Sequence, residues 1–337
     1  MPADIIIESN IPFVRGLFDG VADVSYLPPQ EITPERMQRA DALITRTRTR
    51  CDASLLEGSR CRIIASATIG LDHIDINYCR SAGIEVANAP GCNAPAVAQY
   101  VLASVIAAYG AQRLSDLTIG IVGVGHVGRI VEQWARQLGL KVMLCDPPRA
   151  NEEGRDGFCS LEDIACGADI ITFHTPLTRT GLYPTYHIAG EAFFNSLQHK
   201  PMIINAARGA VVDTSALLCA IDAGKTGRAV IDCWEGEPNI SRDLLGKAFV
   251  ATPHIAGYSR QGKIRATRMA VDAVARTLGL TPAPMTETAP IGPAESITAE
   301  MIVESYDPLA DTAALRRAPS AFESLRNHYS LRPEPGC

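Results

Sequence analysis

Short runs of apolar residues alternate with helix-like segments along most of the chain. In the first part of the chain the apolar runs are residues 5–7, 21–27, 42–45, 63–67 and 84–87. A stronger series begins at Thr118 and comprises residues 118–122, 141–145, 169–173, 202–205, 229–231 and 249–252. Alternation of strand and helix is typical of βα units, which build parallel sheets with helices on their faces. The pattern therefore predicts two α/β units, of which the second is a doubly wound parallel sheet.

Three further segments interrupt or follow these series. Residues 94–111 are apolar almost all round but contain Gln99, Tyr100, Ser104 and Gly110, and they are shorter than the roughly 20 apolar residues a bilayer requires. We predict a buried helix there. Residues 281–299 are rich in Pro, Thr and Ala and indicate a linker. Residues 301–337 show one helical stretch, residues 320–329, and too little apolar material for a core of their own.

A glycine-rich motif, GVGHVG at residues 123–128, lies between an apolar run and a helical pattern. Gly123 permits a tight turn, Gly125 lets the backbone approach a pyrophosphate, and Gly128 lets helix and strand pack closely. The next apolar run ends in Asp146, whose carboxylate suits the two ribose hydroxyls and repels a 2′-phosphate. The motif predicts a Rossmann-type sheet that binds NAD, although Arg149 close by leaves NADP open.

Three polar residues follow three late runs of the same predicted sheet: Arg208, Glu237 and His254. Ligands of open α/β sheets bind outside the carboxyl ends of the strands, so the three side chains can meet in one site. An arginine can hold a carboxylate with two hydrogen bonds, and a histidine can take a proton near neutral pH. Glu237 would orient the imidazole. The set suits oxidation of a 2-hydroxy acid, although each residue alone is more often a surface or ion-pairing residue.

Several motifs together resemble those of the D-isomer-specific 2-hydroxyacid dehydrogenases. They are APGCN at 89–93, the glycine turn, FHTPLT at 173–178, INAARG at 204–209, WEGEP at 234–238 and HIAGY at 254–258. The resemblance implies that Arg208, Glu237 and His254 are catalytic, with His254 transferring the proton. It implies a cofactor site that includes His126, Val127, Asp146, Thr175, Ala206, Ala207, Asp232 and Gly257. It places Thr47, Thr68 and Tyr258 at the substrate.

The resemblance also implies a domain organisation. It predicts a smaller flavodoxin-like α/β substrate (lid) domain over residues 1–93 and 258–280, and a dinucleotide-binding domain over 94–257. Residues 281–337 would form a linker and a truncated dimerisation segment, shorter than relatives carry. Gln99 and Gln261 stand where relatives often have Glu, which we expect to be a minor surface change.

Some marks narrow the expected substrate within the family. NIPF at 10–13, CDPPRA at 145–150 and the Gly262–Lys263 pair after HIAGY resemble one branch of the family. That resemblance implies NAD-dependent oxidation of 4-phospho-D-erythronate to (R)-3-hydroxy-2-oxo-4-phosphobutanoate, a step of pyridoxal 5′-phosphate synthesis. Two alternatives stay open: a dehydrogenase for another D-2-hydroxy acid, such as phosphoglycerate or glyoxylate, and a binding protein that senses NAD without turnover.

The segment TRTRTR at residues 45–50 is the one dense basic cluster near the N-terminus. In an extended strand, alternate side chains point to opposite faces, so we expect three arginines on one face and three threonines on the other. Arg46 is then a candidate for the terminal phosphate of a substrate. A solvated edge with exposed charges is an equally good interpretation.

Composition and charge exclude several classes of protein. The 337 residues are 47% hydrophobic and 20% charged, and the net charge of −6 gives no basic field for nucleic acid. The ten cysteines form no Cys-x-x-Cys pair, and His73, His187, His199 and His328 lack metal-ligand spacing. We expect a cytoplasmic protein that binds no metal, membrane or nucleic acid. The apolar helix at 94–111 suggests a homodimer, because one sheet face would not cover all its sides.

Overall fold

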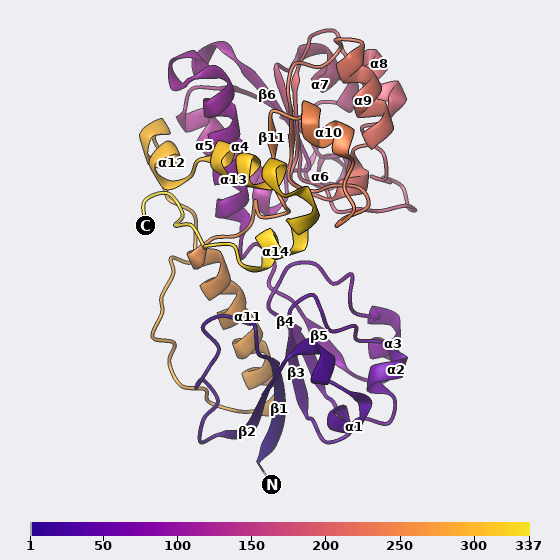
Figure 1. The fold of residues 1–337 in the computed structure, drawn as a ribbon, viewed down its shortest axis with the longest axis vertical. Coiled ribbons are helices and arrows are strands. Elements are labelled where there is room, and N and C mark those ends of the chain that lie inside the picture. The colour runs from indigo at the N-terminus through magenta and orange to yellow at the C-terminus, as the bar shows by residue number, and fades with distance from the viewer. Residues whose placement is uncertain (1) are drawn as a thin grey trace. The chain divides into compact units, whose positions relative to one another are not determined.

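The chain forms two compact units in the computed structural model, which describes residues 2–337. Among the described residues, the first unit consists of 2–93 and Arg260–Ile291, and the second of Ala94–Ser259 and Gly292–Cys337. Each unit is a parallel sheet covered by helices (Figure 1). The two α/β sheets predicted from the alternating pattern are thereby confirmed.

The first unit holds a five-stranded parallel sheet in the order β2-β1-β3-β4-β5. Its strands are β1 (Ala3–Glu8), β2 (Ala22–Leu27), β3 (Ala42–Thr45), β4 (Ile63–Ser66) and β5 (Glu85–Ala87). The helices are η1 (Pro29–Glu31), α1 (Pro34–Met37), α2 (Ala53–Leu56), α3 (Ile76–Ser81) and α11 (Arg260–Leu278). Alternate residues of β1 serve two cores: Ile5 and Ile7 pack with Val274 of α11, and Ile6 packs with Met37. The sheet is buried on both faces, as parallel sheets usually are.

The second unit holds a six-stranded parallel sheet in the order β11-β10-β9-β8-β6-β7. Its strands are β6 (Thr118–Val122), β7 (Lys141–Cys145), β8 (Ile170–Phe173), β9 (Met202–Asn205), β10 (Ala229–Ile231) and β11 (Val250–Ala251). The helices are α4 (Ala94–Tyr109), η2 (Ala111–Asp116), α5 (His126–Gln137), α6 (Pro147–Glu153), α7 (Leu161–Gly167), α8 (Glu191–Ser196), η3 (Gly209–Val211), α9 (Thr214–Asp222) and α10 (Arg242–Lys247). The chain order reverses between β6 and β8, which is where ligands of such sheets bind.

The C-terminal segment contains more structure than the sequence pattern predicts. Where we expected one helical stretch, the structure has α12 (Ala299–Ser305), α13 (Pro308–Arg317), η4 (Pro319–Ala321) and α14 (Phe322–Asn327). The first two helices are too short to show a clear period, but each begins at a capping side chain, Thr298 or Asp307. Ile302 packs into the core beside α4, and Phe322 into the core on the other face of the sheet. The segment is therefore an integral part of the second unit.

Helix α4 is covered by its own chain. Its residues from Ala94 to Ile106 are all buried. Helices α12 and α13 contact it, together with α5. The apolar character of this helix thus needs no second subunit to explain it, and the reasoning that led from α4 to a homodimer is wrong.

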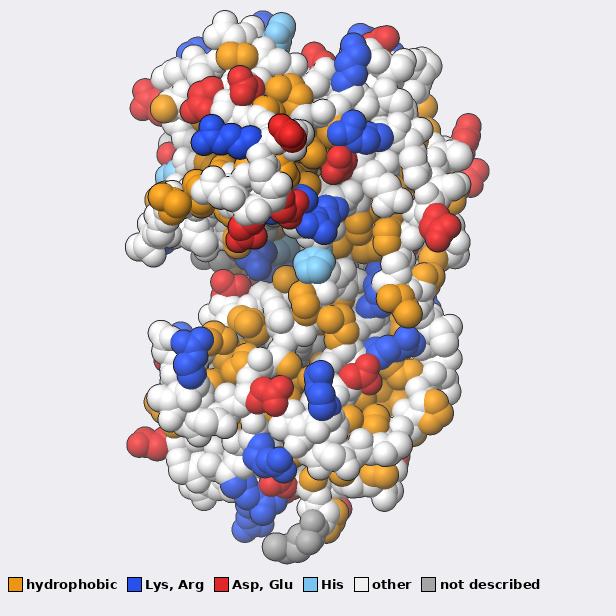
Figure 2. All heavy atoms as spheres, turned by 180° about the vertical axis from the view of Figure 1, so that it is seen from behind, with side chains coloured by type: hydrophobic (Ala, Val, Ile, Leu, Met, Phe, Trp, Pro, Cys, Tyr) orange, Lys and Arg blue, Asp and Glu red, His pale blue; other side chains and the backbone are white. Residues whose placement is uncertain are grey.

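The surface carries no single-sign field on the face that Figure 2 shows, where basic and acidic side chains are interspersed. Within residues 2–337, no helix combines the length and the apolar character needed to cross a bilayer.

Candidate active site

The glycine turn lies between β6 and α5 and has the geometry that a dinucleotide requires. Gly123 has a φ of +90°, and a Cβ there would lie 2.9 Å from the backbone of His174 and Thr175. A Cβ at Gly128 would lie 2.2 Å from the Gly123 oxygen, so helix and turn can pack only with glycine. A Cβ at Gly125, in contrast, would meet no atom of the described residues within 4 Å other than those of its two chain neighbours. Packing therefore accounts for the first and third glycines, and the open space at the second fits a ligand.

Asp146 follows β7 and connects the glycine turn to helix α6. Its Oδ2 accepts a hydrogen bond from the Val124 N–H at 2.8 Å, and its Oδ1 accepts one from the Arg149 N–H at 3.1 Å. Each oxygen keeps a further lone pair for a ribose hydroxyl. The Arg149 guanidinium donates to both oxygens of Glu153 and to the Val124 carbonyl. Arg149 is thus engaged by the protein, which weakens the case for NADP.

The loop after β8 leaves polar atoms without partners beside the glycine turn. Thr175 Oγ1 and His174 Nδ1 are buried and have no hydrogen-bond partner among the described residues. Burial also lowers the pKa of His174 to about 3, so this imidazole is neutral. Such orphaned atoms are rare in native proteins and indicate an absent partner. Together with the space at Gly125 and the exposed His126 and half-buried Val127 at the start of α5, they fit NAD.

His254 and Glu237 form a hydrogen-bonded pair after β11 and β10. His254 Nδ1 and Glu237 Oε2 are 2.8 Å apart, and the Trp234 N–H donates to Glu237 Oε1, also at 2.8 Å. Both oxygens of Glu237 are thereby fixed, and the imidazole is held through Nδ1. The His254 side chain is 29% exposed, so part of the imidazole can be reached from outside the protein.

The surroundings of His254 favour its protonated form. Burial alone lowers the pKa of the imidazole, but the contacts with Cys233 and with Glu237 outweigh burial and raise it well above 6.5. Burial raises the pKa of the Cys233 thiol, although the contact with His254 lowers it in part. Burial raises the pKa of Glu237 too, but the bond to His254 outweighs it and leaves that pKa lowered. The pair matches the arrangement that general acid–base catalysis uses.

The backbone around His254 is fixed by Asp232, which is 1% exposed. Asp232 Oδ1 accepts from Thr252 Oγ1 and from the Ile255 N–H, both at 2.7 Å, and Oδ2 accepts from the Ala256 N–H at 2.9 Å. His254 itself has a φ of +56°. A residue other than glycine adopts this left-handed conformation only where its surroundings enforce it, often at functional sites. The sequence motif does not reveal this role of Asp232.

Arg208 lies after β9 in the same unit, within the loop that also carries Ala206 and Ala207. Its Nη1 donates to the Ala207 carbonyl at 2.9 Å. Asn205 Nδ2 ties the loop to its neighbours by donating to the carbonyls of Arg208, Gly209 and Cys233. A Cβ at Gly209 would lie 2.0 Å from the Trp234 oxygen, so only glycine lets the two loops meet.

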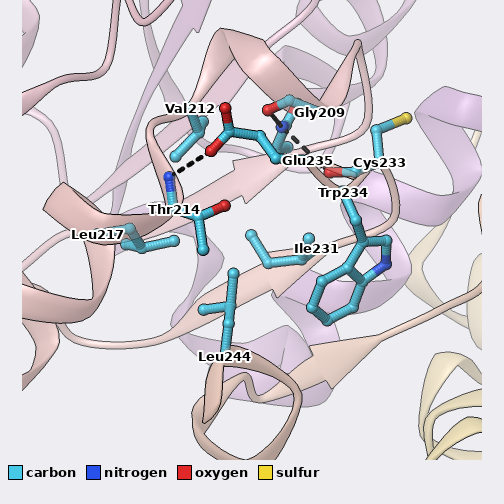
Figure 3. A pocket seen from close by; sticks show the side chains of 10 residues that line it. Gly209, Val212, Thr214, Leu217, Ile231, Cys233, Trp234, Glu235 and Leu244 are labelled. Atoms are coloured by element: carbon cyan, nitrogen blue, oxygen red, sulfur yellow. Dashed lines mark hydrogen bonds between the residues drawn. The ribbon is translucent and has the colours of Figure 1, made fainter. Parts of the chain in front are cut away.

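A small pocket next to these loops is lined by neither residue of the catalytic pair, His254 and Glu237. Figure 3 shows Leu217, Ile231 and Leu244 lining it, with Glu235 accepting a hydrogen bond from the Thr214 N–H at 2.8 Å. Glu235 Oε1 also contacts His187 Nε2 at 2.6 Å. Although Glu235 is two residues from Glu237, it faces a different partner.

Two groups of potential metal ligands have their ligand atoms within 4.8 Å of one another. They are Cys233 with Glu237 and His254, and His187 with Asp213 and Glu235. In both groups the histidine is already hydrogen-bonded to a carboxylate. Cys233 is the residue of the site that sequence reasoning missed, because an isolated cysteine carries no motif.

The three candidates in the first unit follow β3 and β4. Thr68 Oγ1 lies 2.8 Å from Ser66 Oγ and donates to the Arg46 carbonyl at 3.4 Å, so Thr68 and Arg46 are brought together. Thr47 is exposed on the same loop.

The expected alternation of residues 45–50 is wrong, because β3 ends at Thr45 and the chain bends after it. Thr45 Oγ1 and Thr49 Oγ1 both donate to buried Glu8, at 2.7 and 2.5 Å, while Thr47 is exposed. The three threonines therefore do not share one face.

The doubly wound sheet, the glycine turn and the histidine–carboxylate pair define an NAD-dependent dehydrogenase. The NAD-binding domain of the D-isomer specific 2-hydroxyacid dehydrogenases matches residues 95–256. An erythronate-4-phosphate dehydrogenase from Bacteroides thetaiotaomicron is 48% identical over 98% of this chain and 97% of its own. A protein of the same name from Escherichia coli is 40% identical over 98% of this chain and 92% of its own. The chain belongs to the D-isomer-specific 2-hydroxyacid dehydrogenase family.

A solved structure shows the same fold. The D-lactate dehydrogenase of Aquifex aeolicus, complexed with NAD and lactic acid, matches 82% of this chain and 96% of its own with a TM-score of 0.67 at 24% identity. At that identity the likeness concerns the fold alone.

Proposed function

We propose that this enzyme oxidises 4-phospho-D-erythronate at C2 to the 2-oxo acid with NAD, in the synthesis of pyridoxal 5′-phosphate. The observation that carries the proposal is the His254–Glu237 pair at the strand ends of an NAD-binding sheet. The relatives of 40–48% identity, which share nearly the full chain, carry the name of this activity. His254 would take the proton of the C2 hydroxyl at Nε2, and Arg208 would bind the C1 carboxylate with two hydrogen bonds.

Glu237 orients the imidazole and stabilises the imidazolium that forms. NAD, when bound there, would supply the acceptor for the hydride that leaves C2. Gly123, Gly125, His126, Val127 and Gly128 would hold its pyrophosphate, and Asp146 its adenosine ribose. The remaining cofactor contacts that we propose come from Thr175, Ala206, Ala207, Asp232 and Gly257. Thr47, Thr68, Arg46 and Tyr258 would bind the substrate and its phosphate.

Two further parts of the proposal are a cytoplasmic location and a homodimer. NAD and a phosphorylated substrate do not cross membranes freely, which favours the cytoplasm. For the dimer, Val303 of α12 and Leu309 of α13 are 47% and 41% exposed and offer apolar side chains for a contact.

The substrate is tested by following NADH formation over matched 2-hydroxy acids. The panel contains 4-phospho-D-erythronate, D-erythronate and 3-phospho-D-glycerate, and glyoxylate is tested in reverse with NADH. A 2-oxo acid acceptor is added in case NADH stays bound. We expect the highest kcat/KM for 4-phospho-D-erythronate. A higher value for phosphoglycerate or glyoxylate would assign the chain to another reaction of the family, and binding of NAD without any turnover would indicate a sensor.

A further inference from the structure

Arg332, close to the C-terminus, is a buried arginine whose guanidinium contacts the segment that follows His254. The residue is only 6% exposed. Its Nη1 donates to the carbonyls of Ile255 and Tyr258, at 3.0 and 3.3 Å, and its Nη2 to those of Ala256 and Ala96. Its Nε donates to Gln99 Oε1 at 2.9 Å. A guanidinium presents five N–H donors in one rigid plane, and here each nitrogen is used.

Residues Ile255 and Ala256 are consequently held from two sides. Their N–H groups donate to the Asp232 carboxylate, and their carbonyls accept from Arg332. The residue before them, His254, has the strained φ of +56°. Such a conformation persists only where the surrounding contacts enforce it. Arg332 donates to both carbonyls of the two residues directly after His254.

The chain around Arg332 is itself firmly docked. Ser259 pairs with Arg332 in a parallel β-bridge, and Ser259 Oγ donates to Glu334 Oε1 at 2.6 Å. The ring of Tyr258 packs edge-on against that of Tyr329, with centroids 6.1 Å apart.

Gln99 on α4 completes this docking. Its Nε2 donates to the Pro333 carbonyl at 3.0 Å, and the residue is fully buried. The expectation of a minor surface change at Gln99 is therefore wrong, because the side chain joins α4 to the C-terminal residues.

We propose that Arg332 is a positioning residue of the active site. It holds the backbone of residues 255–258, so that His254 keeps its hydrogen bond to Glu237 and Tyr258 keeps its position. The C-terminal segment thereby contributes to turnover as well as to folding. Lysine cannot replace it, because a single ammonium does not span carbonyls in the geometry of a planar fork. This proposal depends on the proposed function in one respect: turnover of the substrate is one of the quantities that its test measures.

The test compares R332A and R332K with a matched control, R316A. Arg316 belongs to the same C-terminal segment and also donates to two backbone carbonyls, but these are the carbonyls of Leu245 and Ala248, which lie outside residues 254–258. For each variant we measure Tm, kcat, the pH dependence of oxidation, and the pKa of His254 by NMR. Guanidinium at millimolar, non-denaturing concentration is added to R332A to restore the missing group.

We expect kcat of R332A to fall on the order of 10²-fold, because a displacement of about 1 Å at a catalytic group can cost that much. The pH at which its oxidation rate rises and the pKa of His254 should both be lower than in wild type, because the imidazole loses its hydrogen bond to Glu237. Guanidinium should restore part of the kcat of R332A. R332K should have a Tm close to that of wild type but a clearly lower kcat. R316A should lose Tm alone.

Unchanged kcat and an unchanged His254 pKa in R332A, with a loss of Tm like that of R316A, would overturn the proposal. If R332A does not fold, wild-type kcat and His254 pKa in R332K overturn it equally. Failure of the proposed function would give a different result. If wild type has no activity on 4-phospho-D-erythronate, the pKa of His254 can still be compared between wild type and R332A.

Discussion

Replacing Glu237 by Gln changes one atom of the catalytic pair and should cost a predictable amount of rate. In the structure two donors, the Trp234 N–H and the His254 Nδ1–H, meet two carboxylate oxygens at 2.8 Å each. Glutamine offers only one acceptor oxygen. If that oxygen faces Trp234, the amide NH₂ faces His254 Nδ1 and keeps the imidazole proton on Nε2, where it blocks uptake of the substrate proton.

The size of the effect follows from the bond that is lost. A hydrogen bond to a charged group contributes about 1.5–3 kcal/mol, and each 1.36 kcal/mol corresponds to tenfold in rate, so kcat should fall about 10- to 150-fold. The pH dependence should change as well. The raised pKa keeps wild-type His254 protonated beyond pH 6.5, and oxidation needs the neutral base, so wild-type oxidation rises with pH above that value. In E237Q this rise in the oxidation rate should occur at lower pH, because the imidazole no longer has the carboxylate beside it.

The assay is steady-state NADH formation between acidic and alkaline pH, with E235Q as the matched control. Glu235 is two residues away and contacts His187 and Thr214. Its variant should retain kcat within about twofold and keep the wild-type profile, as a change away from the reacting groups does. If E237Q showed the same pH dependence and the same kcat as wild type, Glu237 would not be the partner of the catalytic base.

Four other predictions concern cofactor, substrate and assembly. D146A should bind NAD more weakly and discriminate less against NADP, as measured by cofactor titration; equal use of both cofactors by wild type would refute the ribose assignment. R208A should raise KM and lower kcat together, because the carboxylate loses its two hydrogen bonds, and a change in neither would remove Arg208 from the mechanism. R46Q should cost more activity on 4-phospho-D-erythronate than on D-erythronate, whereas equal losses would make Arg46 structural. Light scattering at micromolar concentration should show a dimer, and a monomer would contradict the proposed assembly.

The strands and the glycine turn were accessible from the sequence because local patterns specify them. Residues 118–122 form β6 as the apolar run predicts, and Gly123 has the positive φ that its motif requires. The pairing of Glu237 with His254 could be predicted because parallel strands bring their carboxyl ends to one edge.

Features that depend on distant partners could not be predicted. Thr45 and Thr49 are buried because both bond to Glu8, some forty positions earlier, which no alternation rule contains. Gln99 is buried because residues more than two hundred positions later dock on it. Arg332 resembles an ordinary charged residue near a chain end until the carbonyls of residues 255–258 are seen around it.

The role of His254 in oxidising C2 is tested most directly by a single-turnover experiment with deuterated substrate. Wild type and H254N are mixed with NAD and 4-phospho-D-erythronate that carries deuterium at C2, and formation of reduced cofactor is followed by stopped flow and mass spectrometry. Wild type should deliver the deuterium to the nicotinamide. H254N should bind NAD as wild type does but transfer deuterium about 10²–10⁴-fold more slowly, the usual contribution of a general base. Reduced cofactor without deuterium, or an H254N rate equal to that of wild type, would contradict the account.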